Sequence, residues 1–132
     1  VIFISVNKHL SPKERKEIIK DALIKWYSSK STEIIKQRIN QYSKIMSVMP
    51  QEIKIKDQKK RWGSCSKNGI LRFNWRIAIA PISVVDYIVV HELCHLKVEN
   101  HSADFWKLLS LVFPDYQRRR EWLKNNTPIF KL

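Results

Sequence analysis

The sequence predicts an α+β domain in which a small antiparallel sheet packs against helices. Two stretches with helical apolar spacing come first, alternating apolar residues follow over residues 52–80, and further helical segments complete the chain. The chain has 132 residues and a hydrophobic fraction of 44%, enough for one modest core. We therefore predict a single domain over residues 1–132.

Two helices are predicted within residues 11–47. The first has Ser11 as its N-cap and Pro12 at its first position, and it ends near Ser28. The second runs from Ser31 or Thr32 to about Met46. Apolar residues at helical spacing are Ile18, Ile19, Ala22, Leu23 and Trp26 in the first helix and Ile34, Ile35, Ile39, Tyr42 and Ile45 in the second. We expect both apolar faces to lie in the core rather than bind a partner.

The sheet is predicted over about residues 52–80. Ile53 and Ile55 alternate with lysines, residues 61–66 form a second short strand, and Lys67-Asn68-Gly69 forms a turn. Residues 70–80 alternate throughout, which predicts one long strand. Its inward residues are Leu71, Phe73, Trp75, Ile77 and Ile79, and its outward residues are Arg72, Asn74 and Arg76.

A buried helix is predicted over about residues 83–99. Ser83 is placed as its N-cap, with Asp86 three residues later in a capping-box arrangement. Nearly every position from Ile82 to Leu96 is apolar, so the helix is expected to be covered on most sides. Two more helices are predicted within residues 102–124, separated by Pro114.

The most specific pattern is His91-Glu92-Leu93-Cys94-His95, an H-E-x-x-H sequence on the buried helix. Residues four apart share a helix face, so His91 and His95 can bind one metal ion. Glu92 is then placed to act as general base for a water. A metal ion also gives these buried polar side chains the partners that they need. We predict a Zn²⁺ site here rather than hydrogen-bonded core histidines.

The third zinc ligand is predicted to be His101, with Glu99 and Asp104 as weaker alternatives. An unbroken helix would carry His101 about 9 Å past His95, so the chain must turn before it. Asn100 suits such a turn because it tolerates the left-handed conformation. Ser102 and Asp104 can then start a new helix.

Several motifs, in this order and spacing, resemble the YgjP-like metallopeptidase family, which is similar to SprT-type and WLM-type zincins. The motifs are Lys60-Arg61-Trp62-Gly63-Ser64-Cys65-Ser66, Leu71-Arg72-Phe73-Asn74-Trp75-Arg76, Ala80-Pro81, His91 to His95, Asn100-His101-Ser102 and Phe105-Trp106. The resemblance covers about residues 59–122. It implies a zincin-like fold, a zinc hydrolase with His91, His95 and His101 as ligands, and Glu92 as catalytic base.

Two features limit the resemblance. Val98 stands where metzincins have the glycine of H-E-x-x-H-x-x-G-x-x-H, which argues against that group. Members of the YgjP-like family usually carry a further N-terminal segment, and the chain starts at Val1 without methionine, as a fragment of a longer protein would.

The predicted activity is cleavage of peptide bonds in a peptide or protein substrate. Arg72, Arg76 and Tyr116 are candidates to stabilise the oxyanion. Two alternatives remain: a metal-dependent nucleotide pyrophosphohydrolase, and a non-catalytic, zinc-stabilised module that binds nucleic acid. The net charge of +13 is compatible with a nucleic-acid or nucleotide partner and equally with solubility alone.

The two cysteines, Cys65 and Cys94, lack C-x-x-C spacing, which fits a reducing cytoplasm rather than a disulfide framework. We predict a cytoplasmic protein without membrane contact, because no apolar run spans a bilayer and Val1–Val6 is too short for a signal-peptide core. Cys94 is expected to be a core residue, whereas Cys65, which the resemblance places near the metal, is a weaker candidate for an oxidant-sensitive thiol. Trp106 is expected to pack under the site and His9 to be structural or solvated.

Overall fold

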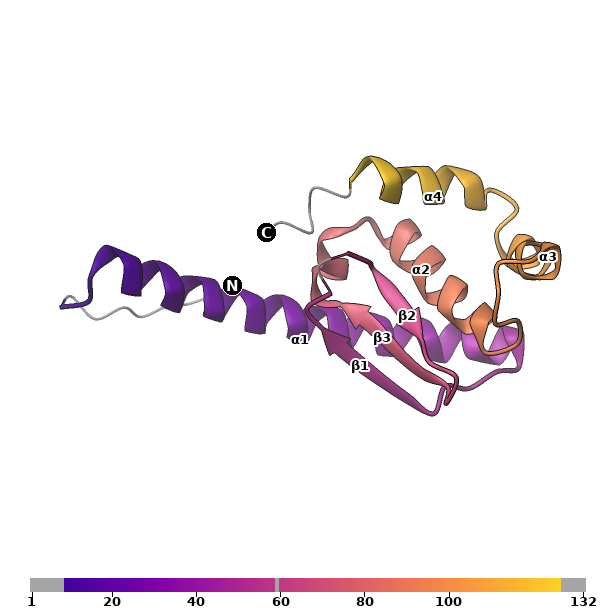
Figure 1. Ribbon diagram of the computed structural model, residues 1–132, viewed down its shortest axis with the longest axis horizontal. Helices are drawn as coiled ribbons and strands as arrows, with labels where there is room; N and C mark the ends of the chain where they lie inside the picture. The colour runs from indigo at the N-terminus through magenta and orange to yellow at the C-terminus, as the bar shows by residue number, and fades with distance from the viewer. Residues whose placement is uncertain (1–8, 59, 127–132) are drawn as a thin grey trace.

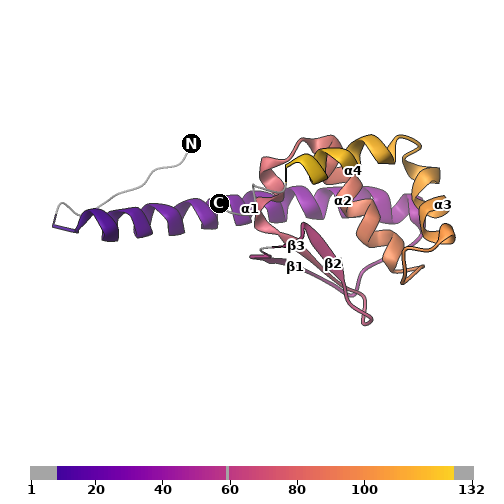
Figure 2. The same cartoon turned by 45° about the horizontal axis from the view of Figure 1, so that its top comes forward.

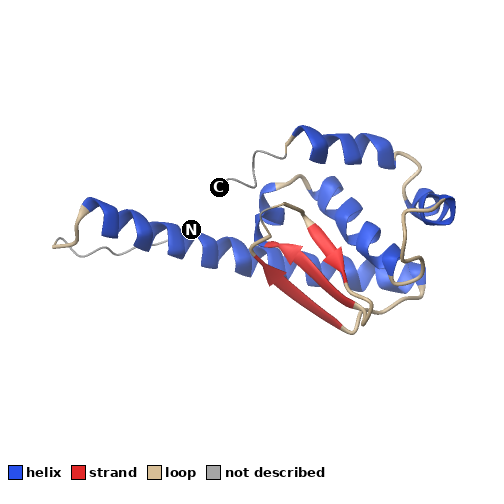
Figure 3. Ribbon diagram, in the orientation of Figure 1, coloured by secondary structure: helices blue, strands red, loops and turns tan. Residues whose placement is uncertain are grey.

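The computed structural model describes residues 9–58 and 60–126 and has the predicted α+β architecture. The three strands lie side by side (Figure 3), and in Figure 2 they form the lower face of the molecule with the helices above them. Val1–Val6 and Lys59 lie outside the described residues. The assignment of residues 1–132 to one domain stays a prediction.

A single helix, α1 (Pro12–Met46), replaces the two helices that the sequence predicted. Its start is as expected, with Ser11 as N-cap and a reciprocal capping box with Glu14. Residues 28–31 contain neither proline nor glycine, and the Thr32 hydroxyl donates to the Ser28 carbonyl (2.8 Å) within the continuing helix. The predicted break between Ser28 and Ser31 is therefore wrong, because the helix continues through these serines.

The two halves of α1 differ in burial. The first half projects beyond the rest of the molecule (Figure 1), and Ile18 and Ile19 are 39% and 38% exposed. The expectation that this apolar face is core is therefore wrong for both. In the second half Ile35 and Ile39 are buried, although Ile45 is 64% exposed.

The sheet is mixed rather than antiparallel. Strand β1 (Glu52–Lys56) pairs parallel with β3 (Ile70–Asn74), and β2 (Gly63–Cys65) pairs antiparallel with β3 on its other side. The order β1-β3-β2 leaves β2 at an edge. The turn before β3 is as predicted, and Gly69 adopts φ 80° in it.

The long predicted strand over residues 70–80 ends at Asn74. A 3-10 helix, η1 (Trp75–Ile79), follows, and the Asn74 side chain caps it by accepting from the Arg76 amide (3.1 Å). Asn74 and Arg76 were expected to face outward, but both are buried. Arg76 donates to Asp57 (2.7 Å), and Asn74 also donates to the carbonyls of Gln58 and Arg61.

Helix α2 (Ile82–His95) crosses the molecule between the sheet and the C-terminal helices (Figures 1 and 2). It begins one residue earlier than predicted, with Pro81 as N-cap and no side-chain cap. Asp86 forms an ion pair with Arg38 of α1 (3.2 Å) instead of a capping box. Most of α2 is buried, as expected.

Helices α3 (Ala103–Val112) and α4 (Tyr116–Asn125) pack on α2 and are close to the predicted bounds. Arg119 of α4 donates to the Ser83 carbonyl in the first turn of α2 (2.8 Å). Ser102 is the N-cap of α3 and Asp104 lies in its first turn. The described residues contain no helix long and apolar enough to cross a membrane.

Candidate metal centre

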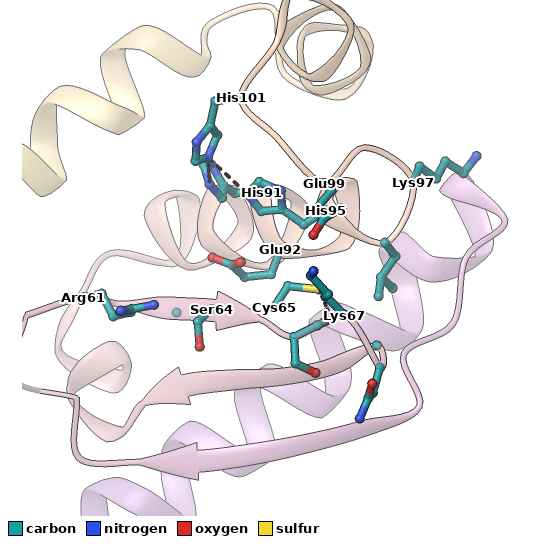
Figure 4. Close-up of a pocket in the computed structure, with 15 residues that line it drawn as sticks. Arg61, Ser64, Cys65, Lys67, His91, Glu92, His95, Lys97, Glu99 and His101 are labelled. Atoms are coloured by element: carbon teal, nitrogen blue, oxygen red, sulfur yellow. Dashed lines mark hydrogen bonds between the residues drawn. The ribbon is translucent and has the colours of Figure 1, made fainter.

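Three imidazoles meet where α2 ends. His91 and His95 lie on the last turn of α2, and His101 lies in the loop before α3. The Nε2 atom of His101 is 3.1 Å from that of His91 and 3.1 Å from that of His95 (Figure 4). Three nitrogens bound to one tetrahedral zinc at about 2.0–2.1 Å lie roughly 3.3 Å apart. The spacing of this cluster is therefore close to that of a zinc ligand set.

The other ring nitrogens of the two helical histidines face fixed partners. His95 Nδ1 lies 3.1 Å from the Val98 carbonyl, and His91 Nδ1 lies 3.4 Å from the Tyr87 hydroxyl. A carbonyl only accepts, so Nδ1 of His95 carries the proton and its Nε2 lone pair faces the cluster. Metal-binding histidines commonly have such a partner, because it fixes the ring orientation.

The turn that brings in His101 differs from the one predicted. Helix α2 ends at His95 rather than near residue 99, and the Val98 amide donates back to the Cys94 carbonyl (2.8 Å). Asn100 is not left-handed, because Ser47 is the one non-glycine residue with positive φ in residues 9–58 and 60–126. The chain thus turns over Leu96–Val98, earlier than the sequence suggested.

The cluster contains none of the alternative ligands. Within the described parts of the chain, His91, His95 and His101 are the one group of histidine, cysteine or acidic side chains spaced to hold a metal ion. Glu99 lines the neighbouring cleft but does not join the group, and neither does Asp104.

Burial and the neighbouring imidazoles favour the neutral form of His91 and of His101. The pKa of His91 is lowered to about 3, first by burial and then by His95, His101 and Arg120. Burial also lowers the pKa of His101, with His95 and Arg120 contributing. Neutral imidazoles are the form that binds metal, so the cluster is prepared for an ion at neutral pH.

Glu92 points from α2 toward strand β2 (Figure 4) and is 6% exposed. Burial raises its pKa to about 8, and Arg61 opposes the shift. The β2 backbone is so close that a Cβ atom on Gly63 would lie 3.1 Å from Glu92 Oε2 and 3.2 Å from its Cγ. Because Gly63 has no side chain, the Glu92 side chain can occupy this position beside the histidines without a steric clash.

Aromatic rings support the cluster from the side of α3. His95 stacks on Phe105 with ring centroids 4.5 Å apart, and His101 stacks on Trp106 at 5.8 Å. Tyr116 also stacks on Trp106, with ring centroids 5.3 Å apart. The Arg120 guanidinium lies 4.8 Å from the centre of the Trp106 ring. Trp106 thus packs against the site, as predicted.

A cleft of about 690 Å³ opens beside the cluster, between β2 and the end of α2. Its lining residues are Arg61, Gly63–Gly69, His91, Glu92, His95–Lys97, Glu99 and His101. The predicted oxyanion candidates Arg72, Arg76 and Tyr116 are not among them. No site role was predicted for the cleft cations Arg61, Lys67 and Lys97, although Arg61 begins and Lys67 follows the strand predicted over residues 61–66.

The cysteines and His9 were also assigned from sequence. Cys94 is fully buried, as expected of a core residue. Cys65 lines the cleft, and its pKa is raised by burial and then by Glu92, so the thiolate that oxidants attack is disfavoured. His9 is exposed next to the start of α1 and takes no part in the site.

Comparison with known proteins gave two findings. A family model described as "YgjP-like, metallopeptidase domain" matches residues 4–126. The chain is similar to the crystal structure of the metallopeptidase zymogen of Pyrococcus abyssi abylysin, with 22% sequence identity, coverage of 70% of this chain and 94% of that chain, and a TM-score of 0.62. At this identity the structural likeness concerns the fold alone. No curated protein matches.

Proposed function

The chain belongs to the YgjP-like metallopeptidase family, and on that premise we propose that it is a zinc-dependent peptidase. His91, His95 and His101 hold the ion, and Glu92 is the general base. The observation that carries the proposal is the convergence of three Nε2 atoms at one edge of a cleft whose lining also includes a buried carboxylate.

The donor set fits zinc better than magnesium or calcium. Three neutral imidazoles suit a borderline-soft ion, whereas the harder ions prefer oxygen ligands. Three protein ligands also leave a fourth tetrahedral position for water, which is the arrangement of catalytic zinc sites. When bound, zinc would act as a Lewis acid and lower the pKa of a water to near 7.

Glu92 supplies the proton transfers. Burial raises its pKa in the metal-free protein, which makes its ionised form a stronger base than an exposed carboxylate. A zinc ion bound beside it would favour that ionised form, which accepts a proton from the attacking water. The same carboxyl then donates that proton to the leaving amine nitrogen. Gly63 and the wall of β2 hold the side chain in position for both steps.

Strand β2 offers a way to hold a peptide. It is an edge strand that lines the cleft, and its side away from β3 carries backbone donors and acceptors that no strand of the described sheet uses. An extended peptide can pair with such an edge as an added strand. This would place its backbone alongside Glu92 and the histidines.

The alternative of a nucleotide pyrophosphohydrolase draws on the cleft cations Arg61, Lys67 and Lys97, which suit phosphate oxygens. Against it, the group spaced to hold an ion consists of three imidazoles, and such donors suit zinc better than the magnesium that phosphate chemistry commonly uses. A non-catalytic nucleic-acid-binding role is the third candidate.

We also propose a cytoplasmic location, which the two unpaired cysteines support.

The decisive experiment compares wild-type protein with Glu92→Gln on peptide and nucleotide substrates, with zinc content measured in both. Glutamine keeps the shape of the side chain but accepts no proton at neutral pH. Peptide hydrolysis should fall by about 100-fold or more while zinc stays bound. Full peptidase activity in a folded, zinc-loaded variant would refute the role of Glu92, and nucleotide hydrolysis without peptide hydrolysis would favour the alternative.

A further inference from the structure

The cleft beside the histidines is positively charged at both ends of strand β2. Arg61 precedes the strand, Lys67 follows it, and Lys97 lies on the turn after α2. None of the three forms an ion pair in the described residues 9–58 and 60–126. Beside a cleft, cations outside any ion pair can attract an anionic ligand, although Arg61 also acts electrostatically on Glu92.

The positions of two of these cations suit a ligand that runs along the cleft. Figure 4 shows Arg61 at one end of the lining, Lys67 at the other, and Glu92 and the histidines between and above them. Lys97 points away toward the rim in the same view. Arg61 and Lys67 therefore flank the place where a bond would be cut.

The distance from the middle of β2 to Arg61 and to Lys67 can be compared with the length of a bound peptide. Arg61 and Lys67 each lie three positions from Ser64, the middle residue of β2. An added strand rises by about 3.3 Å per residue, so three residues on either side of its centre extend past both ends of β2 (Gly63–Cys65), toward the two cations.

We propose that the cleft takes extended peptides with acidic side chains on both sides of the scissile bond, and that Arg61 and Lys67 determine this specificity. The inference rests on the peptidase function proposed above and names its substrate class. The lining side chains carry three positive charges, from Arg61, Lys67 and Lys97, against two carboxylates, Glu92 and Glu99. Glu92 is reserved for the reaction, so Glu99 is the one carboxylate that offsets the attraction.

A peptide suits this surface better than a nucleotide. The cations are spread along an edge strand, whose unused backbone groups an extended peptide can pair with. Compact phosphate groups are usually held by several backbone amides of a glycine-rich loop or a helix start. The whole chain contains two glycines and no such loop.

The experiment uses two peptides that differ only in charge. One has Asp or Glu at the three positions on each side of the cleaved bond, and the other has Asn or Gln there. The ratio of kcat/KM for acidic over amide peptide is measured for wild type, Arg61→Gln, Lys67→Gln and the double variant. Because both peptides are tested on one preparation, partial loss of zinc or of folded protein cancels in the ratio.

We expect wild type to prefer the acidic peptide by about 10-fold and each single variant to lower that preference by about 2- to 5-fold. The preference should weaken at high salt, because exposed charges are screened within about 8 Å at physiological ionic strength. The matched control is Lys36→Gln, an exposed lysine of α1 that does not line the cleft. It removes the same charge from the overall field and should leave the ratio unchanged.

A binding measurement decides the matter independently of turnover. Fluorescence anisotropy of labelled peptides on Glu92→Gln protein should give the same order of affinities, acidic above amide, with the same loss in the cation variants. Equal affinities for the two peptides, or a preference that Lys36→Gln lowers as much as Lys67→Gln does, would overturn the inference while peptide cleavage stands. Cleavage of neither peptide would count against the proposed function instead. A nucleoside triphosphate that displaces the acidic peptide at lower concentration than the unlabelled peptide itself would overturn the peptide assignment.

Discussion

Helix α2 and the first half of α1 are both helices with many apolar residues, yet their surroundings are opposite. In α2, Val89, Val90 and Leu93 are fully buried between the sheet and the other helices. In α1, residues 12–30 project beyond the rest of the molecule (Figure 2), and Ile18 and Ile19 keep more than a third of their surface exposed. Apolar periodicity identifies a helix face, but tertiary structure decides whether that face is covered.

The boundary between the two environments lies at Ser31. Its hydroxyl donates to the Trp75 carbonyl and accepts from the Ala78 amide (3.2 Å), which attaches α1 to η1. Beyond this point Ile35 and Ile39 are buried. The side chains of the proposed site all lie beyond this boundary, in the packed part of the molecule.

Substitutions in the two helices should differ most in their effect on zinc binding, which the loss of a histidine of α2 should abolish or strongly weaken. In His91→Ala or His95→Ala two imidazoles remain, and no other side chain in residues 9–58 and 60–126 is spaced to replace the third. We expect zinc affinity to fall by more than about 100-fold, the upper range for losing only a hydrogen-bond partner of a ligand. Peptide hydrolysis should fall to background. Elemental analysis of purified protein tests this, and unchanged zinc in either variant would contradict the site; Ile18→Ala should keep its zinc.

A second comparison lies within α1. Ile35→Ala removes a fully buried side chain and should lower the free energy of unfolding by about 2–5 kcal/mol. Ile18→Ala removes a side chain that is 39% exposed and introduces a better helix former. Its cost should stay under about 1 kcal/mol. Urea titrations of both variants measure this, and equal costs would mean that something covers residues 12–30 in solution.

The parts of the site that the sequence predicted depend on local geometry. His91 and His95 share a face because they are four residues apart on a helix, whatever the rest of the fold does. His101 followed from the requirement for a turn. The place of that turn did not follow, because it depends on the Val98 carbonyl and amide, which bond to His95 and Cys94.

The parts that the sequence did not predict depend on contacts between distant segments. Alternation favoured a strand through residue 80, but Asn74 turns inward to bond Gln58, Arg61 and Arg76 and ends the strand. The charged cleft needs β2 to pair with β3 and to face α2, and no local pattern contains that pairing. Tertiary contacts therefore override the alternation of apolar and polar residues that predicted a strand over residues 70–80.

The close contact between α2 and β2 gives a smaller, sharper test. In Gly63→Ala the new Cβ lies 3.1 Å from Glu92 Oε2, so the carboxylate must shift by a few tenths of an ångström. We expect kcat to fall by about 10-fold with KM and zinc content nearly unchanged, since misplaced catalytic groups lose rate steeply.

The double variant Gly63→Ala/Glu92→Asp tests whether Gly63 acts through Glu92. Aspartate lacks the Oε2 atom that the Cβ approaches most closely but keeps a Cγ, so Gly63→Ala should cost less in that background. An equal factor in both backgrounds would show that the alanine acts elsewhere, for example on strand pairing.

The smallest expected effect is the pH dependence of the stability of the metal-free protein. The pKa of Glu92 rises from its ordinary 4.5 to about 8 through burial. Between these values the folded state keeps a proton that the unfolded state has released, so stability is full below pH 4.5 and is lost as pH rises toward 8. His91 acts in the opposite direction, because its pKa falls from 6.5 to about 3 and stability therefore rises with pH up to 6.5. The two contributions oppose each other below pH 6.5.

Above pH 6.5 Glu92 acts alone among the groups with shifted pKa values, since the cysteine and tyrosine shifts begin at 9 or higher. In chelator-treated protein the free energy of unfolding should fall between pH 6.5 and 8 by at most about 1.4 kcal/mol per pH unit. Urea titrations across this range measure the slope, with Glu92→Gln as the control that should be flat. A flat wild-type profile would mean that Glu92 is more hydrated than its contact with β2 implies. Equal slopes in both proteins would assign the proton to another group.

The exposed half of α1, which has no buried acid, should contribute nothing to the slope, so Ile18→Ala should reproduce the wild-type profile.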